Sequence, residues 1–341
     1  MKQVLVTGAS GYIAKHIVLQ LLQSGYKVRG SVRSMSRSGE VRSAVQSELD
    51  GTVDLDEMLS FVELDLMHDD GWDEALTGID VLVHTASPFP LTSPKDENEL
   101  IRPAVDGTLR ALKAAHSNGV KRVVMTSSTA SVLYGDLPEG GAAYDESHWT
   151  DVNHPACSSY SKSKTLAEKA AWEFVETDGH DIDLTCINPG FVLGAPLDTT
   201  YGTSLEVMAR MISGKDPAVP QLGFASVDVR DVAAMHVGAI ANENSIGKRI
   251  LSVSQFLWFV DLARTAKAEF PDRKIPTRLA PNWLIRFLSL FDGQIRTIVP
   301  LLGKSFDVSN QRAKSLLDVE FRDPRDSAIE SIRYLIDNKL A

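Results

Sequence analysis

A glycine-containing turn lies near the start of the chain, between an apolar run and a helical pattern. Val4-Leu5-Val6 has the composition of a short buried strand, and Thr7-Gly8-Ala9-Ser10-Gly11-Tyr12-Ile13-Ala14 follows it directly. Apolar residues then recur every three or four positions from Ile13 to Leu22, which is typical of one face of a helix. A second strand is expected over Tyr26–Val32. This order, completed in about 30 residues, predicts a β-α-β unit whose turn binds the pyrophosphate of a dinucleotide.

Small residues stand where a dinucleotide must come close to the backbone of this turn. Gly8 allows the tight turn, and Gly11 lets a pyrophosphate approach the helix N-terminus, where free N–H groups and the dipole favour anions. Ala14 is small enough for close helix–strand packing. An ordinary glycine turn is the alternative, and the surrounding strand and helix argue against it. The residues expected to contact a cofactor are Thr7, Gly8, Ser10, Gly11, Tyr12 and Ile13.

The end of the second expected strand indicates which dinucleotide binds. NAD enzymes usually place an acid there, about 20 residues after the turn, to bind the ribose hydroxyls. Val32 and Arg33 occupy the candidate positions, Arg37 follows closely, and no acid occurs between Gly11 and Glu40. A guanidinium forms charge-assisted bonds with a 2′-phosphate, which a carboxylate would repel. We therefore expect NADP(H) held by Arg33 and Arg37; the alternative is that Arg33 is only a solvated surface charge.

Expected strands and helices alternate as far as residue 190. Further strands are expected at Leu59–Leu66, Val81–His84, Val123–Met125 and Leu184–Ile187, with long helices at Glu97–Asn118 and from Tyr160 through Val175. This alternation predicts an α/β fold, a doubly wound parallel sheet of the Rossmann type with a smaller C-terminal substrate lobe. We expect residues 1–190 to form the NADP-binding domain. Residues 191–341 should form mainly the substrate-binding lobe, with some later segments returning to the sheet.

Composition narrows the classes of function. The chain has 341 residues, of which 43% are hydrophobic and 23% charged, as in ordinary globular proteins. A formal net charge of −10 argues against a nucleic-acid partner, because a phosphate-binding surface needs basic excess. Two cysteines are too few for a disulfide framework, and Met1 leads directly into the first strand. We expect a cytoplasmic enzyme with no membrane partner.

Tyr160 and Lys164 form the most informative pair later in the chain. A spacing of four puts both side chains on one face of a helix, whereas Lys162 points elsewhere. An ammonium beside a phenol favours the phenolate, so we expect Lys164 to lower the pKa of Tyr160. No Cys, Asp or Glu accompanies His16 or His148 at metal-like spacing, so no metal is expected.

Hydroxyl groups follow the strand expected at Val123–Met125, in Thr126-Ser127-Ser128. The carboxyl end of a central strand is where ligands bind in a doubly wound sheet, and a hydroxyl there can hydrogen-bond a substrate carbonyl. Serines also cap turns, which is the alternative for Ser128. With Tyr160 and Lys164 downstream, we favour a catalytic role for Ser128, with Tyr160 as the general acid.

These motifs together resemble the extended short-chain dehydrogenases/reductases, in particular the dihydroflavonol-reductase-like group. That group includes cinnamoyl-CoA reductases and microbial aldehyde and ketone reductases. The resemblance covers nearly the whole chain. It rests on Val6–Ile13, Val32-Arg33, Thr126–Ser128, Tyr160–Glu168, Asn188-Pro189-Gly190 and Val229–Ala233. It implies hydride transfer from NADPH to a small, apolar or aromatic aldehyde or ketone, in a reversible reaction.

The resemblance also implies roles for individual residues. The family's serine, tyrosine and lysine correspond to Ser128, Tyr160 and Lys164, with Tyr160 and Lys164 also touching the cofactor. Its adenine-side acid corresponds to Asp65, although Asp65 could instead cap the next turn. The other implied cofactor contacts are Leu66, Thr85, Ala86, Ser87, Pro189, Gly190 and Val192.

Four residues are candidate walls of a substrate pocket: Phe89, Leu133, Phe191 and Phe224. Leu133 stands where plant dihydroflavonol reductases carry an asparagine that contacts the flavonoid, which suggests a more apolar substrate than a polyphenol.

Two other functions share this fold. Nucleotide-sugar epimerases and dehydratases favour an acid after the serine of the fifth strand or at the end of the second; this chain has Thr129-Ala130 and Val32-Arg33 there. A non-catalytic, cofactor-sensing regulator would commonly lose the tyrosine and lysine, which this chain keeps. We order them as reductase, sugar-modifying enzyme and regulator, and leave the choice between monomer and homodimer open.

Overall fold

A parallel sheet forms the centre of the protein, whose computed structural model describes residues 1–87, 96–135, 143–291 and 293–341. Within those ranges the sheet has seven strands in the order β3-β2-β1-β4-β5-β6-β9. They are β1 (Gln3–Thr7), β2 (Lys27–Val32), β3 (Leu59–Glu63), β4 (Val81–His84), β5 (Arg122–Thr126), β6 (Asp183–Pro189) and β9 (Lys248–Ser252). The expected doubly wound sheet is confirmed, and its order reverses between β1 and β4, which opens a crevice at their carboxyl ends.

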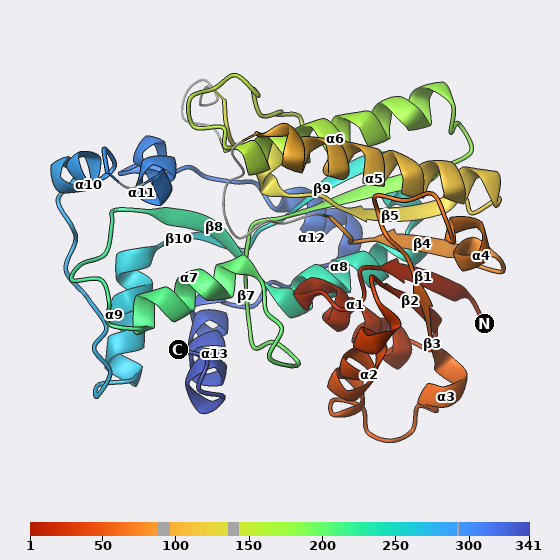
Figure 1. Ribbon diagram of the computed structural model, residues 1–341, viewed down its shortest axis with the longest axis horizontal. Coiled ribbons are helices and arrows are strands. Elements are labelled where there is room, and N and C mark those ends of the chain that lie inside the picture. Colours follow the sequence, from red (N-terminus) through yellow and green to blue (C-terminus); the bar gives the residue numbers. More distant parts are fainter. Residues whose placement is uncertain (88–95, 136–142, 292) are drawn as a thin grey trace.

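Helices cover both faces of this sheet (Figure 1). One layer contains α1 (Tyr12–Gln23), α2 (Ser38–Gln46), α3 (Leu55–Met58), α8 (Val229–Ala241) and α12 (Gln311–Leu317). The other contains α4 (Trp72–Leu76), α5 (Asn98–Ser117) and α6 (Ser159–Thr177). Strand β1 shows why both layers are needed. Val4 and Val6 are buried against the first layer and Leu5 against the second, so the strand is apolar throughout.

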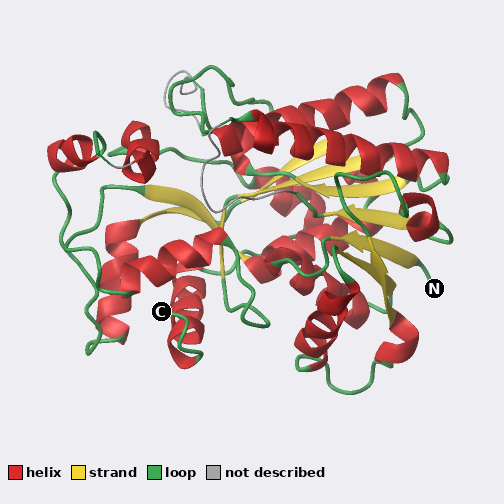
Figure 2. Ribbon diagram, viewed as in Figure 1, coloured by secondary structure: helices red, strands yellow, loops and turns green. Residues whose placement is uncertain are grey.

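A second, smaller sheet lies beside the first (Figure 2). In the described residues it has three strands in the order β10-β8-β7, with β8 parallel to β7 and antiparallel to β10. The strands are β7 (Phe191–Leu193), β8 (Gly223–Asp228) and β10 (Gln255–Trp258). Around them lie α7 (Thr203–Ile212), α9 (Phe259–Glu269), α10 (Asn282–Leu288), α11 (Gly293–Ile298) and α13 (Pro324–Asp337).

The chain passes more than once between the two sheets. After β7 and β8 it returns through α8 and β9, and β9 pairs with β6 in the main sheet. Helix α12 packs against α8 and β9 before α13 joins the small sheet. The third strand ends at Glu63 rather than at Leu66, because Asp65 already accepts a hydrogen bond within the following turn.

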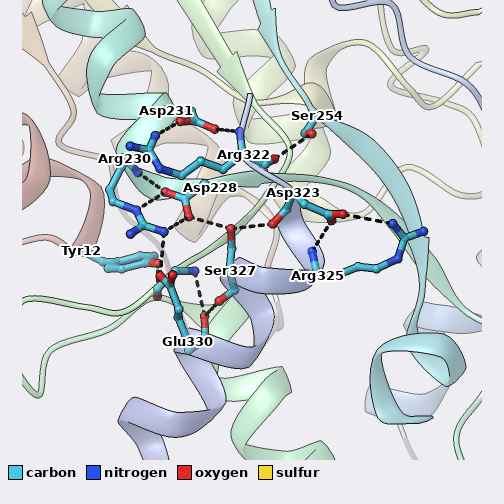
Figure 3. Close-up of polar contacts among 12 residues, drawn as sticks. Tyr12, Asp228, Arg230, Asp231, Ser254, Arg322, Asp323, Arg325, Ser327 and Glu330 are labelled. Carbon is cyan, nitrogen blue, oxygen red and sulfur yellow. Dashed lines mark hydrogen bonds and ion pairs between the residues drawn. The ribbon is translucent and has the colours of Figure 1, made fainter. Parts of the chain in front are cut away.

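A polar network fastens α13 to α8 (Figure 3). The buried carboxylate of Asp228 accepts hydrogen bonds from Arg230 Nε at 2.8 Å and Ser327 Oγ at 2.7 Å. Arg230 also pairs with Glu330 of α13 at 2.7 Å, and Arg322 pairs with Asp231. These bonds fix the C-terminal helix to the start of α8, which packs against the helix after the glycine turn.

Candidate active site

A cavity of about 1070 Å³ runs along the carboxyl edge of the main sheet and reaches the small sheet. The last residues of three central strands line it: Thr7 of β1, Val32 of β2 and Thr126 of β5. Phe191 and Phe224 line it from the small sheet. The cavity therefore lies where a doubly wound sheet binds its ligands.

The glycine turn lines one part of this cavity. Gly8 has φ of +65°, and a side chain there would meet Ala86 at 3.1 Å. Gly11 caps α1 in an extended conformation, so the helix N-terminus, with its positive dipole end, begins beside the cavity. The expected cofactor contacts that line the cavity are Thr7, Gly8, Ser10, Gly11, Tyr12, Ile13, Arg33, Arg37, Leu66, Thr85, Ala86, Ser87, Tyr160, Gly190 and Val192.

Thr7 connects the glycine turn to the segment after β4. Its Oγ1 accepts hydrogen bonds from the backbone N–H groups of Thr85 and Ala86, both at 3.1 Å, and lies 2.9 Å from His84 Nδ1. The hydroxyl of Thr85 donates back to the carbonyl oxygen of Thr7 at 2.5 Å. The structure thus joins two segments that the sequence singled out separately.

The two arginines after β2 differ in their contacts. Arg33 is exposed and forms no ion pair with any residue that the structure describes, although its side chain lines the cavity. Arg37 Nη2 lies 2.6 Å from Glu40 Oε1, and the same carboxylate lies 3.6 Å from the buried ammonium of Lys15. Arg33 is therefore the one of these two guanidinium groups that has no counter-charge among the described residues.

Three expected cofactor residues do not line the cavity: Asp65, Pro189 and Lys164. Asp65 accepts a hydrogen bond from the backbone N–H of Met67 at 2.9 Å, as a turn cap does, while Leu64 and Leu66 on either side face the cavity. Pro189 is buried within β6. For Asp65, the contacts match the turn-capping alternative.

Ser128 and Tyr160 meet at the cavity wall. Ser158 caps α6 by accepting a hydrogen bond from Ser161 N–H at 3.1 Å, and this fixes the helix that carries Tyr160 and Lys164. The hydroxyl of Ser128, which also accepts from Ala130 N–H at 3.1 Å, acts on the phenol of Tyr160 and lowers its pKa. Lys164 is buried behind the wall, and its ammonium has no hydrogen bond or ion pair with a described residue.

Burial dominates the pKa values of these groups. It raises the pKa of Tyr160, and the hydrogen bond from Ser128 only partly opposes this effect. The expectation that Lys164 lowers the pKa of Tyr160 below its ordinary value is therefore wrong for the protein without a ligand. Burial lowers the pKa of Lys164 to about 8, while the carboxylate of Glu168 raises it. The lysine is therefore mostly protonated at neutral pH and loses its charge as the pH rises through about 8.

The part of the cavity beyond Tyr160 is largely aromatic. Phe191 and Phe224 stack with ring centroids 5.0 Å apart and an interplanar angle of 11°. Leu133 also lines the cavity. Phe89 lies outside the described residues. Further lining residues that the sequence did not indicate are Tyr134, Tyr201, Glu206, Val207, Ala225 and Phe306.

Tyr134 stands out among these unexpected residues. Burial raises its pKa to about 12, and its hydroxyl is hydrogen-bonded to Ser161. No motif marks Tyr134, and only its position six residues after Ser128 could have indicated it. It is a second phenol beside Tyr160, and its high pKa makes it a weak proton donor.

Two findings concern the described ranges alone. They contain no group of three or more His, Cys, Asp or Glu residues arranged to hold a metal ion. They also contain no helix that is both long and apolar enough to cross a lipid bilayer.

A glycine turn at a helix N-terminus and a serine–tyrosine pair on one cavity define a dinucleotide-dependent oxidoreductase of the short-chain dehydrogenase/reductase class. A family model described as NAD dependent epimerase/dehydratase matches residues 4–253. The chain belongs to this family, the extended branch of the class, as its motifs predict.

Three similar proteins illustrate the relationship. Cinnamoyl-CoA reductase CAD2 of Medicago truncatula is 34% identical over 99% of this chain and 97% of its own. Tetraketide alpha-pyrone reductase 1 of Arabidopsis thaliana is 35% identical over 81% of this chain and 83% of its own. The crystal structure of yeast methylglyoxal/isovaleraldehyde reductase Gre2 with NADPH superimposes with a TM-score of 0.82 at 27% identity, covering 99% of both chains.

Proposed function

We propose that this protein is an NADPH-dependent reductase that transfers hydride to the carbonyl carbon of a small, apolar or aromatic aldehyde or ketone, and that also runs in reverse. The pairing of Ser128 with Tyr160 on the wall of the cavity that begins at the glycine turn carries this proposal. The names of the relatives support it, since they are reductases and the Gre2 structure contains NADPH.

The residues that line the cavity fit NADPH. Gly8 leaves space beside Ala86 that a side chain would fill, and the N-terminus of α1 offers N–H groups to a pyrophosphate. Arg33, whose guanidinium has no ion pair with a described residue, is available to a 2′-phosphate. Bound there, NADPH would supply the hydride.

The chain's own groups would handle the proton and the orientation of the carbonyl. Ser128 can donate a hydrogen bond to the carbonyl oxygen, and Tyr160 can donate the proton that this oxygen gains. Lys164 would bind the ribose of the cofactor and supply positive charge behind the phenol as the proton leaves. Phe191, Phe224 and Leu133 would hold an apolar substituent and exclude water.

Sugar epimerisation or dehydration is the second candidate, which the family's description raises. Thr129 and Ala130 line the cavity directly after Ser128, where an acid would be needed for dehydration. The wall formed by Phe191 and Phe224 suits an apolar substituent better than the hydroxyl groups of a sugar, so we favour carbonyl reduction.

The remaining expectations belong to the same proposal. Residues 1–190 would bind the cofactor and residues 191–341 mainly the substrate, with α8 and β9 returning to the main sheet, where β9 pairs with β6 and α8 packs on it. Cys157 and Cys186 are both free, which suits a cytoplasmic enzyme. The partner would be a small carbonyl or alcohol rather than nucleic acid or membrane, with the enzyme a monomer or homodimer.

The direct test is to follow the nicotinamide absorbance of NADPH with purified protein and a panel of aliphatic and aromatic aldehydes and ketones. We expect absorbance loss that depends on the carbonyl compound. Loss with none of them, in protein that binds NADPH, would refute the proposed function.

A further inference from the structure

Glu168 is a fully buried carboxylate below the catalytic groups. It follows Lys164 by four residues and Tyr160 by eight, so all three lie along one face of α6. A buried carboxylate is costly unless several donors satisfy it. Hydrogen-bond donors to Glu168 come from three other segments of the chain: the loop that carries Ser128, the end of β6, and β9.

The first segment carries Ser128. The hydroxyls of Ser127 and Ser131 lie 2.5 Å and 2.6 Å from Glu168 Oε2. These two residues flank Ser128 in the sequence, and Ser131 Oγ also lies 2.8 Å from the Ser128 carbonyl oxygen. Glu168 therefore holds the loop on both sides of the serine that contacts Tyr160.

The second segment is the end of β6. Asn188 Nδ2 donates to Glu168 Oε2 at 2.8 Å and to Ser131 Oγ at 3.1 Å. Asn188 directly precedes Pro189-Gly190, where the chain enters the cavity wall. The same carboxylate oxygen thus connects the Ser128 loop to the start of the substrate side.

The third segment is β9, which supplies Arg249. Its Nε donates to Glu168 Oε1 at 2.6 Å, and its guanidinium stacks on the ring of Trp149 at 3.6 Å from the centroid. Nη1 donates to the carbonyl oxygens of His148 at 2.7 Å and Glu146 at 3.1 Å. The Arg249 charge and these donors outweigh burial and hold the pKa of Glu168 below its usual value, so the carboxylate is ionised.

A structural role alone does not explain this pair. Well-packed apolar residues often stabilise a core as well as or better than a buried ion pair does. What an ion pair adds is fixed geometry, since every donor must point at one carboxylate. Here that geometry positions the residues on both sides of Ser128.

Glu168 also acts on Lys164 through charge. The buried face of α5 and the turn Thr129–Ser131 bring no charged residue to this part of α6. The titratable groups around this part of α6 are Tyr160 and Glu168 of α6 itself, His84 of β4, Cys186 of β6 and Arg249 of β9. The carboxylate of Glu168 is the negative charge in this set.

We propose that Glu168 is a positioning residue for carbonyl reduction, holding Ser128 at Tyr160 through Ser127 and Ser131 and keeping Lys164 protonated. This inference rests on the proposed function.

Two substitutions separate the two effects. Glu168→Gln keeps the shape but removes the charge, so kcat should fall about 100-fold and the alkaline limb of the pH profile should move to lower pH. Glu168→Asp keeps the charge but withdraws it by one methylene, so kcat should fall without that movement. The Kd for NADPH should stay within about twofold for both. Glu173→Gln, an exposed change on the same helix, is the matched control.

Glu168→Gln leaves Arg249 buried without its counter-charge and could unfold the protein. Ser131→Ala is therefore a second variant that tests the positioning role with the ion pair intact. It keeps the ion pair and removes one link to the Ser128 loop, so kcat should fall about tenfold, measured at a temperature where circular dichroism shows the variant to be folded. Unchanged kcat in Ser131→Ala and Glu168→Asp would overturn the positioning role.

An NMR titration of ¹³Cε-labelled lysine, with Lys164 assigned through Lys164→Arg, tests the charge role without turnover. The pKa of Lys164 should fall in Glu168→Gln and stay unchanged in Glu173→Gln. An unchanged pKa in both would overturn the charge role. Wild-type protein that fails to reduce any carbonyl would count against the proposed function, and this titration would still decide the role of Glu168.

Discussion

The hydroxyl of Tyr12 donates a 2.7 Å hydrogen bond to the carbonyl oxygen of Gly194. Tyr12 begins the helix after the glycine turn, and Gly194 begins the segment that leads into α7. Three residues further along α1, the buried ammonium of Lys15 pairs with Asp198 of the same segment. Gly194 N–H in turn donates to Ser331 of α13 at 2.8 Å. The glycine turn and the small sheet are therefore fastened together at the cavity.

Tyr12→Phe should weaken this connection. The substitution leaves a buried carbonyl oxygen without its donor, which typically costs about 1–3 kcal/mol. We expect a lower free energy of unfolding in urea titrations and weaker NADPH binding. Tyr26→Phe, on the surface turn before β2, should change neither quantity. Equal stability of Tyr12→Phe and wild type would show that the bond contributes nothing.

Arg33→Asp should move cofactor preference toward NADH. Arg33 lines the cavity and has no ion pair among the residues that the structure describes. A hydrogen bond to a charged group contributes about 1.5–3 kcal/mol, which corresponds to roughly 10- to 150-fold in affinity. The ratio of kcat/KM values for NADPH and NADH should fall by at least tenfold. Arg42→Asp, whose guanidinium is engaged by Asp56 and Leu59, is the control for a change of charge in the same region. If Arg33→Asp keeps the wild-type ratio, another residue reads the 2′-phosphate.

Local patterns predicted the parts of the fold that depend on neighbours in sequence. Apolar periodicity and the glycine turn identified β1, α1 and β2, and a spacing of four placed Tyr160 and Lys164 on one helix. Strand β4 was predicted with its observed bounds, because Val81-Leu82-Val83 is a short apolar run of the kind that a strand buried on both faces requires.

Other features depend on contacts between distant segments, which no local pattern records. Phe306 reaches the cavity from a loop more than 100 residues after Tyr160, and Tyr134 has no motif around it. The raised pKa of Tyr160 follows from burial, which a spacing cannot reveal. The ion pair of Glu168 with Arg249 likewise became visible only in three dimensions.

Gly190→Ala should damage the junction between the two sheets. A side-chain carbon at Gly190 would lie 2.2 Å from the carbonyl oxygen of Ala225, so β7 and β8 would have to move apart at the cavity wall. We expect a loss of about 1–3 kcal/mol in the free energy of unfolding and a raised KM for the carbonyl substrate. Gly39→Ala, where nothing lies within 4 Å, should be neutral or slightly stabilising. Wild-type values for Gly190→Ala would contradict the observed packing.

Carbonyl reduction should decline above about pH 8. Burial lowers the pKa of Lys164 from 10.5 to about 8, so its ammonium is present below that pH and is lost as the pH rises through it. The plot of kcat/KM against pH should be level below this value and fall above it.

The fold should survive the same change in pH. A lysine whose pKa is lower in the folded than in the unfolded state costs stability below about pH 8, and this cost disappears as the pH rises toward 10.5. Circular dichroism should therefore show native protein where activity has already declined. Activity that stays level well above pH 8 would remove the Lys164 ammonium from the mechanism.

The most direct test compares NADPH oxidation by wild type, Tyr160→Phe and Tyr134→Phe with one carbonyl substrate that the wild type reduces, alongside the Kd for NADPH. Removing a positioned general acid costs about 10²- to 10⁴-fold in rate. We predict that loss in kcat for Tyr160→Phe with an unchanged Kd, and a much smaller effect for Tyr134→Phe, whose phenol has a pKa of about 12. Wild-type turnover in Tyr160→Phe would contradict the assignment of Tyr160 as the proton donor.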